Sequence, residues 1–269
     1  MKRSFVFLMC CISFLPLHSA IHEISNMEEI LPYVDAKTWL VFDIDNTLIE
    51  AKQMLGSDQW YSHQVMEMQK IPQEQKERRA HELRALFKKV QVIADMQPVE
   101  AITPQLLEDL QKRGNTLMAL TARYPKTLVS ITMKHLKESK IDFKKTAPHQ
   151  EKIDFYLQDP VKYRSGVLFV GDNNKGKAFV AFLKRSAVKP EKIIFVDDKQ
   201  KHVENMGQAL EELNINYEGF RYSHADEKVN NFDPKIADLQ KNFLQQVLSD
   251  SDARAILEKD SLTRGGHLN

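Results

Sequence analysis

Cysteine is almost missing from this sequence. Its 269 residues contain only Cys10 and Cys11, and both lie within the first 20 positions. If that segment is removed from the mature protein, no thiol remains, which excludes disulfides and thiol catalysis. An excess of charge of one sign is missing too, because 38 Lys and Arg residues are matched by 37 Asp and Glu residues. The chain therefore carries no electrostatic footprint for a nucleic-acid partner.

The first 20 residues differ from the rest of the chain. They combine a short basic start, an almost uncharged apolar run over residues 4–17, and the small residues Ser19 and Ala20. This order predicts a signal peptide over residues 1–20 and an exported protein, periplasmic or secreted. An uncleaved anchor is the alternative, although the run is short for a transmembrane helix. The residues before the two cysteines are too large to favour lipid modification, and no stretch of the mature chain could span a bilayer.

Four short apolar runs predict buried strands. Each is apolar at consecutive positions, as in parallel strands that are covered on both faces. They are Thr38–Phe42, Thr116–Leu120, Val167–Val170 and Lys192–Val196. Amphipathic patterns predict helices over Gln73–Val92, Pro104–Lys112, Thr127–Ser139, Lys177–Arg185 and Val203–Leu213. Alternating strands and helices predict an α/β fold, a doubly wound parallel sheet with helices on both faces.

The length of the chain fits one such domain with an insertion. We expect the core to comprise residues 21–48 and 95–230. Residues 49–94 have a helix-forming composition and follow the first strand, which predicts an inserted helical cap. Residues 231–269 predict a helical C-terminal extension, and residues 124–165 a second, less regular insertion.

Polar side chains follow each predicted strand. Because ligands bind outside the carboxyl ends of the strands in such sheets, we expect these side chains to converge on one site. Singly, each would more often be structural, for example as a helix N-cap. Together, the like charges need a cation, and hard oxygen ligands favour Mg²⁺ over zinc. The residues are Asp43, Asp45, Thr121, Lys175, Asp197 and Asp198.

Four motifs around these residues resemble the signatures of the haloacid dehalogenase-like superfamily of hydrolases. DIDNT at residues 43–47 resembles the DxDxT motif, LTAR at 120–123 the second, NKG at 174–176 the third and FVDD at 195–198 the fourth. They occur in the order of the family. The finer pattern, which includes GSDQWY at residues 56–61, resembles an uncharacterised branch of exported bacterial proteins in that superfamily.

The resemblance implies a role for each residue. Asp43 would attack phosphorus and form an aspartyl-phosphate. Asp45 would protonate the leaving oxygen and then deprotonate the attacking water. Thr121 would donate a hydrogen bond to a phosphoryl oxygen, and Lys175 would neutralise charge on the nucleophile and the transferring group.

The resemblance also implies the ligands of Mg²⁺. They would be Asp43, the backbone carbonyl of Asp45, and the pair Asp197 and Asp198. We expect Asp198 to be the closer ligand of the pair, because VDD aligns with the more usual VGD at that residue.

Other signals have two interpretations each. Residues 171–177 spell GxxxxGK, the start of a nucleotide-binding P-loop, but Ala178 stands where a hydroxyl would ligate magnesium. Lys177 is the alternative third-motif lysine. Arg123 could contact substrate or pair with a site carboxylate. Trp60 and Tyr61 could line the substrate pocket or pack inside the cap. We expect His202 to be a surface residue.

The predicted function is magnesium-dependent hydrolysis of a small phosphorylated substrate through Asp43. Two alternatives remain at this point. One is a degenerate protein that binds a phosphorylated ligand or a host partner without turnover. The other is a phosphotransferase on the same scaffold that uses an acceptor other than water.

Overall fold

The computed structural model describes residues 19–265. The predicted signal segment lies outside the described residues except for Ser19 and Ala20, which begin the first strand, β1 (Ser19–Ile24). None of the helices within residues 19–265 has the length and apolar character needed to cross a membrane.

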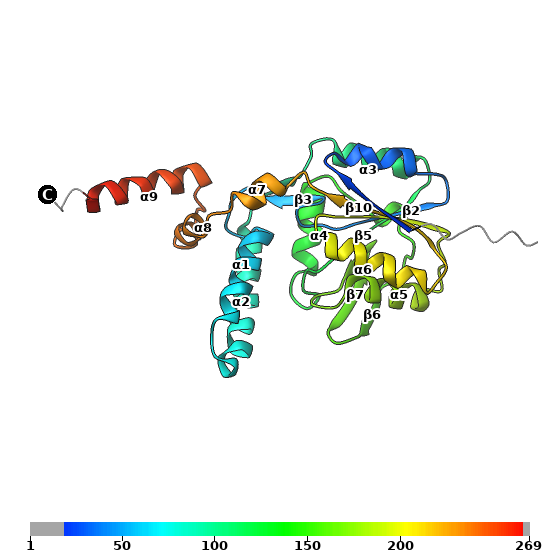
Figure 1. Cartoon of the computed structure of the whole chain (residues 1–269), viewed down its shortest axis with the longest axis horizontal. Helices are drawn as coiled ribbons and strands as arrows, with labels where there is room; N and C mark the ends of the chain where they lie inside the picture. The colour runs from blue at the N-terminus through cyan, green and yellow to red at the C-terminus, as the bar shows by residue number, and fades with distance from the viewer. Residues whose placement is uncertain (1–18, 266–269) are drawn as a thin grey trace, which may run out of the picture.

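One eight-stranded sheet forms the centre of the molecule (Figure 1). Its first six strands in spatial order are parallel, and β7 and β6 are added antiparallel at one edge. The order is β1, β10 (Asn216–Tyr222), β9 (Lys192–Asp197), β2 (Thr38–Phe42), β5 (Thr116–Thr121), β8 (Val167–Phe169), β7 (Pro160–Arg164) and β6 (Ile153–Tyr156). The predicted α/β fold class is confirmed.

Helices cover both faces of the sheet because its central strands are apolar on both. Leu40 and Phe42 of β2 belong to one buried cluster, and Val41 between them belongs to the other. The first cluster includes residues of the 3₁₀ helix η1 (Met27–Tyr33), α3 (Thr103–Lys112) and α4 (Val129–Glu138). The second includes residues of α5 (Lys175–Ser186) and α6 (Gln200–Glu211).

A helical hairpin follows the first central strand, as Figure 1 shows in cyan. It is formed by α1 (Asp58–Gln69) and α2 (Gln73–Ile93). Its base is a two-stranded antiparallel ribbon of β3 (Ile49–Ala51) and β4 (Met96–Pro98). The hydroxyl of Ser57 caps α1 by accepting a hydrogen bond from the backbone N–H of Trp60 at 3.1 Å.

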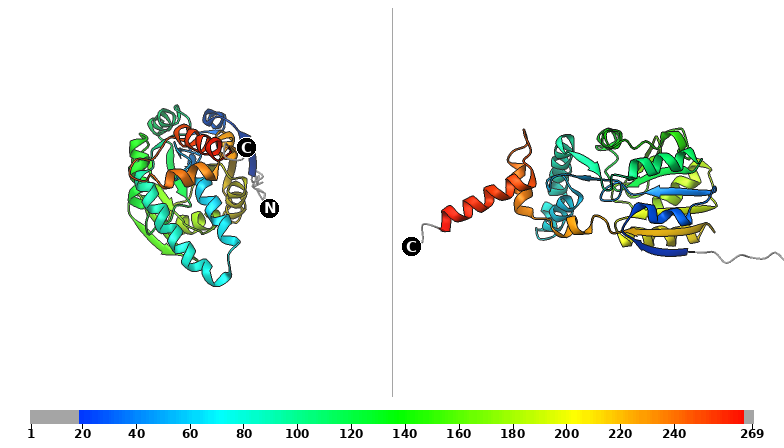
Figure 2. Two further views of the ribbon diagram at one scale, coloured as in Figure 1. Left: turned by 90° about the vertical axis from the view of Figure 1, so that its left-hand side faces the viewer. Right: turned by 90° about the horizontal axis from the view of Figure 1, so that it is seen from above.

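The C-terminal helices lie on the hairpin side of the molecule. They are α7 (Asp226–Asn230), α8 (Pro234–Lys241) and α9 (Asp250–Gly265). Ala237 of α8 packs in a buried cluster with Leu55, Trp60 and Val90. In both Figure 1 and Figure 2, α9 extends away from the sheet.

Several elements differ from the sequence prediction. Neither edge strand β1 nor its neighbour β10 was expected, and α5 begins at Lys175 instead of Lys177. The segment expected to be less regular contains the predicted helix as α4, and in addition a short 3₁₀ turn η2 (Lys144–Thr146) and the hairpin of β6 and β7, which were not expected.

Candidate functional site

The register of the parallel sheet brings two of the predicted acidic residues together. Phe42 at the end of β2 pairs with Val196 of β9, and the backbone N–H of Asp43 donates to the carbonyl of Val196 at 2.8 Å. Asp43 therefore lies beside Asp197. The chain then turns sharply at Asn46, whose φ of 58° is a left-handed conformation that asparagine tolerates better than most residues.

Lys175 joins these two acids. Its Nζ lies 2.6 Å from Oδ1 of Asp43 and 2.6 Å from Oδ2 of Asp197, and all three side chains are at least nine-tenths buried. Lys175 can reach both because it is the first residue of α5, behind Asn174, whose side chain caps the helix. The predicted lysine is thus the one that meets the carboxylates, whereas Lys177 is exposed on α5.

Burial and mutual charge change the pKa values of these three groups. Burial raises the pKa of the Asp43 carboxyl to about 6, although Lys175 works in the opposite direction. Burial also disfavours ionisation of Asp197, but Lys175 and His202 outweigh it and hold the pKa of Asp197 below its ordinary value. For Lys175, burial lowers the pKa and the two carboxylates raise it, with a net increase.

Asp198 completes a cluster that fits a hard cation. One carboxylate oxygen from each of Asp43, Asp197 and Asp198 lies within 4.8 Å of the others. Oδ1 of Asp198 is buried and has no hydrogen-bond partner among the described residues. Burial, and then the charges of Asp197 and Asp43, raise the pKa of Asp198 well above its ordinary value. A bound Mg²⁺ would satisfy the orphan oxygen and offset the repulsion.

Asp45 is not part of this cluster. Its carboxylate accepts hydrogen bonds from Arg123, which is itself buried and also contacts Thr132 and the His135 ring. Burial would raise the pKa of Asp45, but the Arg123 guanidinium holds it below its ordinary value. Of the two interpretations of Arg123, the structure agrees with the one in which it pairs with a site carboxylate.

Two threonines complete the loops at the strand ends. Thr121 is fully buried, and its Oγ1 accepts a hydrogen bond from the backbone N–H of Arg123 at 3.1 Å. Thr47 binds the opposite loop, because its Oγ1 accepts from the backbone N–H of Asp198 at 3.1 Å. These bonds fix the loops that carry the charged groups.

Of the two interpretations of Trp60, the structure agrees with packing inside the cap: its side chain is 1% exposed and stacks on Phe87 at 6.0 Å between ring centroids. The expectation for His202 is wrong. His202 is not a free surface residue, because its Nδ1 lies 3.1 Å from both oxygens of Asp197. The sequence did not indicate this contact, because the apolar positions predict a helix only from Val203. In the structure α6 begins at Gln200, so His202 belongs to its first turn.

Lys199 is a further residue near the site that the sequence analysis did not identify. Its backbone N–H donates to Oδ1 of Asp197 at 2.9 Å, and its ammonium lies 2.7 Å from Asp58 on α1. The charged side chain thus links the loop after β9 to the hairpin. No sequence motif marks this contact, since Asp58 and Lys199 come from segments that only the fold brings together.

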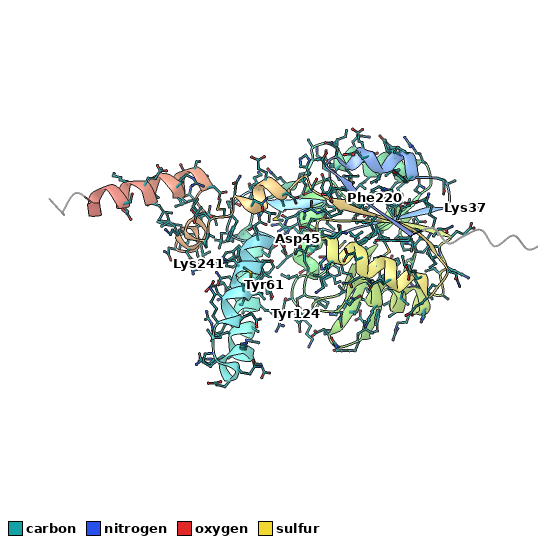
Figure 3. The ribbon with its side chains drawn as sticks, viewed as in Figure 1. Lys37, Asp45, Tyr61, Tyr124, Phe220 and Lys241 are labelled. Atoms are coloured by element: carbon teal, nitrogen blue, oxygen red, sulfur yellow. The ribbon has the colours of Figure 1, made fainter. Side chains whose placement is uncertain are left out.

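A cavity of about 430 Å³ lies between the hairpin and the ends of the strands. Figure 3 labels Asp45, Tyr61 and Tyr124 in this region, where the hairpin faces the sheet. Asp45, two residues after Asp43, is part of the cavity wall, so the cavity adjoins the charged site. Its wall includes Asp58, Tyr61, Val65, Met66, Arg84, Phe87, Arg123, Tyr124, Leu128, Asp172, Lys199 and His202.

Known proteins resemble this chain in sequence and in fold. A family model described as "Protein of unknown function (DUF2608)" matches residues 21–254. A Chlamydia pneumoniae protein named "Putative outer membrane protein" is 30% identical over 256 residues, 94% of this chain and 95% of that protein.

Two solved structures align with this chain at low sequence identity. A haloacid dehalogenase-like family hydrolase from Streptococcus pneumoniae aligns with a TM-score of 0.43 and 13% identity, over 68% of this chain and 94% of that chain. An HAD family enzyme from Bacteroides thetaiotaomicron, in complex with magnesium and inorganic phosphate, aligns with a TM-score of 0.37 and 11% identity, over 67% of this chain and 92% of that chain.

Proposed function

The chain belongs to the family of unknown function DUF2608, and we propose that it is a magnesium-dependent phosphohydrolase that acts on phosphomonoesters through Asp43. One observation carries the proposal. The Lys175 ammonium lies 2.6 Å from both Asp43 and Asp197, in a buried site that Asp198 shares. A nucleophilic carboxylate, a cation for the transferring group and a set of oxygen ligands are thereby held together.

In this proposal Asp43 attacks the phosphorus of the substrate. A bond forms between its carboxylate oxygen and phosphorus while the bond from phosphorus to the leaving oxygen breaks, which gives an aspartyl-phosphate. Lys175 lies against the attacking carboxylate and neutralises charge on the equatorial oxygens. Asp43, Asp197 and Asp198 would hold Mg²⁺, with the backbone carbonyl of Asp45. When bound, this ion supplies positive charge for the developing negative charge of the phosphoryl group.

Asp45 serves as the acid and base in this scheme. It gives a proton to the leaving alcohol oxygen, and later takes one from the water that hydrolyses the aspartyl-phosphate. Its position in the wall of the cavity supports this role, because the leaving group would lie in that cavity. Thr121 would contact a phosphoryl oxygen, and residues 49–94 would act as the cap that excludes water from the site.

We further propose that the protein acts after export. The basic start, apolar run and small residues of positions 1–20 support this. The name of the Chlamydia pneumoniae relative, which refers to the outer membrane, is consistent with it.

The test is hydrolysis of p-nitrophenyl phosphate with Mg²⁺ and with a chelator. We expect Mg²⁺-dependent release that Asp43→Asn lowers by at least about a thousandfold. Asp238→Asn, an exposed acid on α8, is the matched control and should retain activity. Product analysis with an added alcohol distinguishes hydrolysis from phosphoryl transfer. A folded protein that neither turns over phosphate esters nor binds beryllium fluoride at Asp43 would rule out the proposal.

A further inference from the structure

The cavity beside Asp45 has a composition that restricts the substrate. We propose that it binds the leaving group of the phosphomonoester, and that this leaving group is uncharged and apolar, such as an arylalkyl alcohol. The inference rests on the proposed function, because it takes the phosphoryl group to lie against Asp43. The volume of about 430 Å³ falls in the lower part of the range for small-molecule sites.

The hairpin contributes an apolar patch to the cavity wall, beside its polar residues Asp58, Ser62 and Arg84. Tyr61 and Val65 lie four residues apart on α1, and therefore on one face of the helix, with Met66 beside them. Phe87 of α2 continues this wall, with its ring centroid 4.6 Å from that of Tyr61. Met66 is 61% exposed, which is a large apolar surface for a residue at the wall of a cavity. An apolar ligand would remove this surface from water.

The sheet side of the cavity adds further apolar surface. Leu128 and Tyr124 lie opposite the hairpin, and the Arg84 guanidinium covers the Tyr124 ring at 5.1 Å. An aromatic or alkyl group that extends from the phosphoryl site would thus have apolar side chains on both sides.

The charged groups of the wall are already paired. Arg84 binds Asp172 at 2.9 Å, and Lys199 binds Asp58 at 2.7 Å. Arg123 binds Asp45 at 2.7 Å. A second phosphate or a carboxylate on the leaving group would have to displace one of these acids, because it needs a cation of its own. This disfavours nucleotides and phosphorylated acids as substrates.

Sugar phosphates gain less from this cavity. Ser62 and Thr127 offer hydroxyls, but most uncharged side chains of the wall are apolar or aromatic, and a leaving group with many hydroxyls cannot cover that surface without losing hydrogen bonds to water. The cavity therefore favours an apolar leaving group over one with multiple hydroxyls.

The test compares two esters of primary alcohols, so that the chemistry of the leaving oxygen is similar. With the full chain and Mg²⁺, we expect kcat/KM for 2-phenylethyl phosphate to exceed that for glycerol 1-phosphate by about tenfold or more. Met66→Ser should lower this ratio about fivefold. Met68→Ser changes the same residue type on the same helix outside this cavity, and should leave the ratio unchanged. An equal or reversed preference in the wild type would overturn the inference.

Binding separates this inference from the proposed function. Calorimetry with 2-phenylethylphosphonate, which cannot be hydrolysed at its P–C bond, should show tighter binding than methylphosphonate, with the difference reduced in Met66→Ser. If this pattern appears without turnover of either ester, the specificity stands and the hydrolysis proposal fails. If glycerol 1-phosphate is hydrolysed faster, the hydrolysis proposal stands and the specificity fails. The absence of both turnover and phosphonate binding would overturn the inference.

Discussion

Arg123 holds Asp45 with two parts of one guanidinium group: Nε lies 2.9 Å from Oδ2 and Nη2 lies 2.7 Å from Oδ1. The Arg123 side chain is 2% exposed and that of Asp45 22%. The pairing lowers the pKa of the Asp45 carboxyl, so this group is deprotonated, has no proton to donate and is a weak base while the pair is intact. The acid role proposed for Asp45 therefore requires the pair to loosen when substrate binds.

The pair also contributes to stability. We expect Arg123→Met to lower the free energy of unfolding by about 3 kcal/mol, because it leaves the Asp45 carboxylate without its partner. Adding Asp45→Asn to that variant should recover part of the loss. Urea denaturation of the two single variants and the double variant measures the coupling. A double variant whose loss equals the sum of the single losses would show that the pair is not coupled.

His135 makes stability depend on pH. Burial, and then the Arg123 charge, lower the pKa of the His135 imidazole to about 4. The unfolded chain takes up this proton near pH 6.5, so the free energy of unfolding falls as the pH drops from about 6.5 towards 4. We expect a loss of about 2 kcal/mol at pH 5 relative to pH 7. His135→Gln should remove this part of the pH dependence, and His81→Gln, at an exposed position of α2, should retain it.

Asp198 supplies a test of the cation site without turnover. At ten times its dissociation constant, Mg²⁺ should raise the free energy of unfolding by about 1.4 kcal/mol, and a chelator should reverse the effect. Asp198→Asn should be at least as stable as the wild type without metal, because one buried like charge is gone, and should lose most of the response to Mg²⁺. Asp238→Asn is the control. Thermal melts with and without Mg²⁺ measure both quantities, and an undiminished response in Asp198→Asn would contradict the assignment.

Gly176 keeps Lys175 in position. A Cβ at this residue would lie 2.2 Å from the backbone oxygen of Asn205 on α6. We expect Gly176→Ala to lower the free energy of unfolding by about 3 kcal/mol, because α5 and α6 must separate. Lys177→Ala, at the next and exposed position of α5, should change stability by less than about 0.5 kcal/mol. Chemical denaturation of both variants checks this, and equal stability of the two would contradict the packing argument.

The central strands were predictable because a short run of consecutive apolar residues, bounded by polar or small ones, is typical of a buried parallel strand. The ends of the four predicted strands lie within one residue of those in the structure. β10 was missed because its sequence, NYEGFRY, mixes polar residues with aromatic ones and places Gly219 inside the strand. That glycine is needed there: a Cβ would lie 2.5 Å from Val203 on α6.

The candidate site was predictable for residues at the ends of strands and at the start of a following helix. Parallel register places Asp43 beside Asp197, and Lys175 meets both from the first position of α5. Trp60 could not be placed, because the inward face of α1 depends on the packing of α2 and α8 against it. The pairings Lys199 with Asp58 and Arg84 with Asp172 depend on how the hairpin meets the sheet, and local patterns carry no information on that.

The position of β1 has a consequence for the order of folding. The register pairs Ser19 with Tyr217 and Ile24 with Tyr222. The first described strand, β1, can therefore join the sheet only after β10, the last strand in the sequence, is in place. About 200 residues separate these partners, which makes the contact slow to form. A growing chain cannot close this edge before Tyr222 has been synthesised. The polypeptide must therefore remain incompletely folded through most of its synthesis.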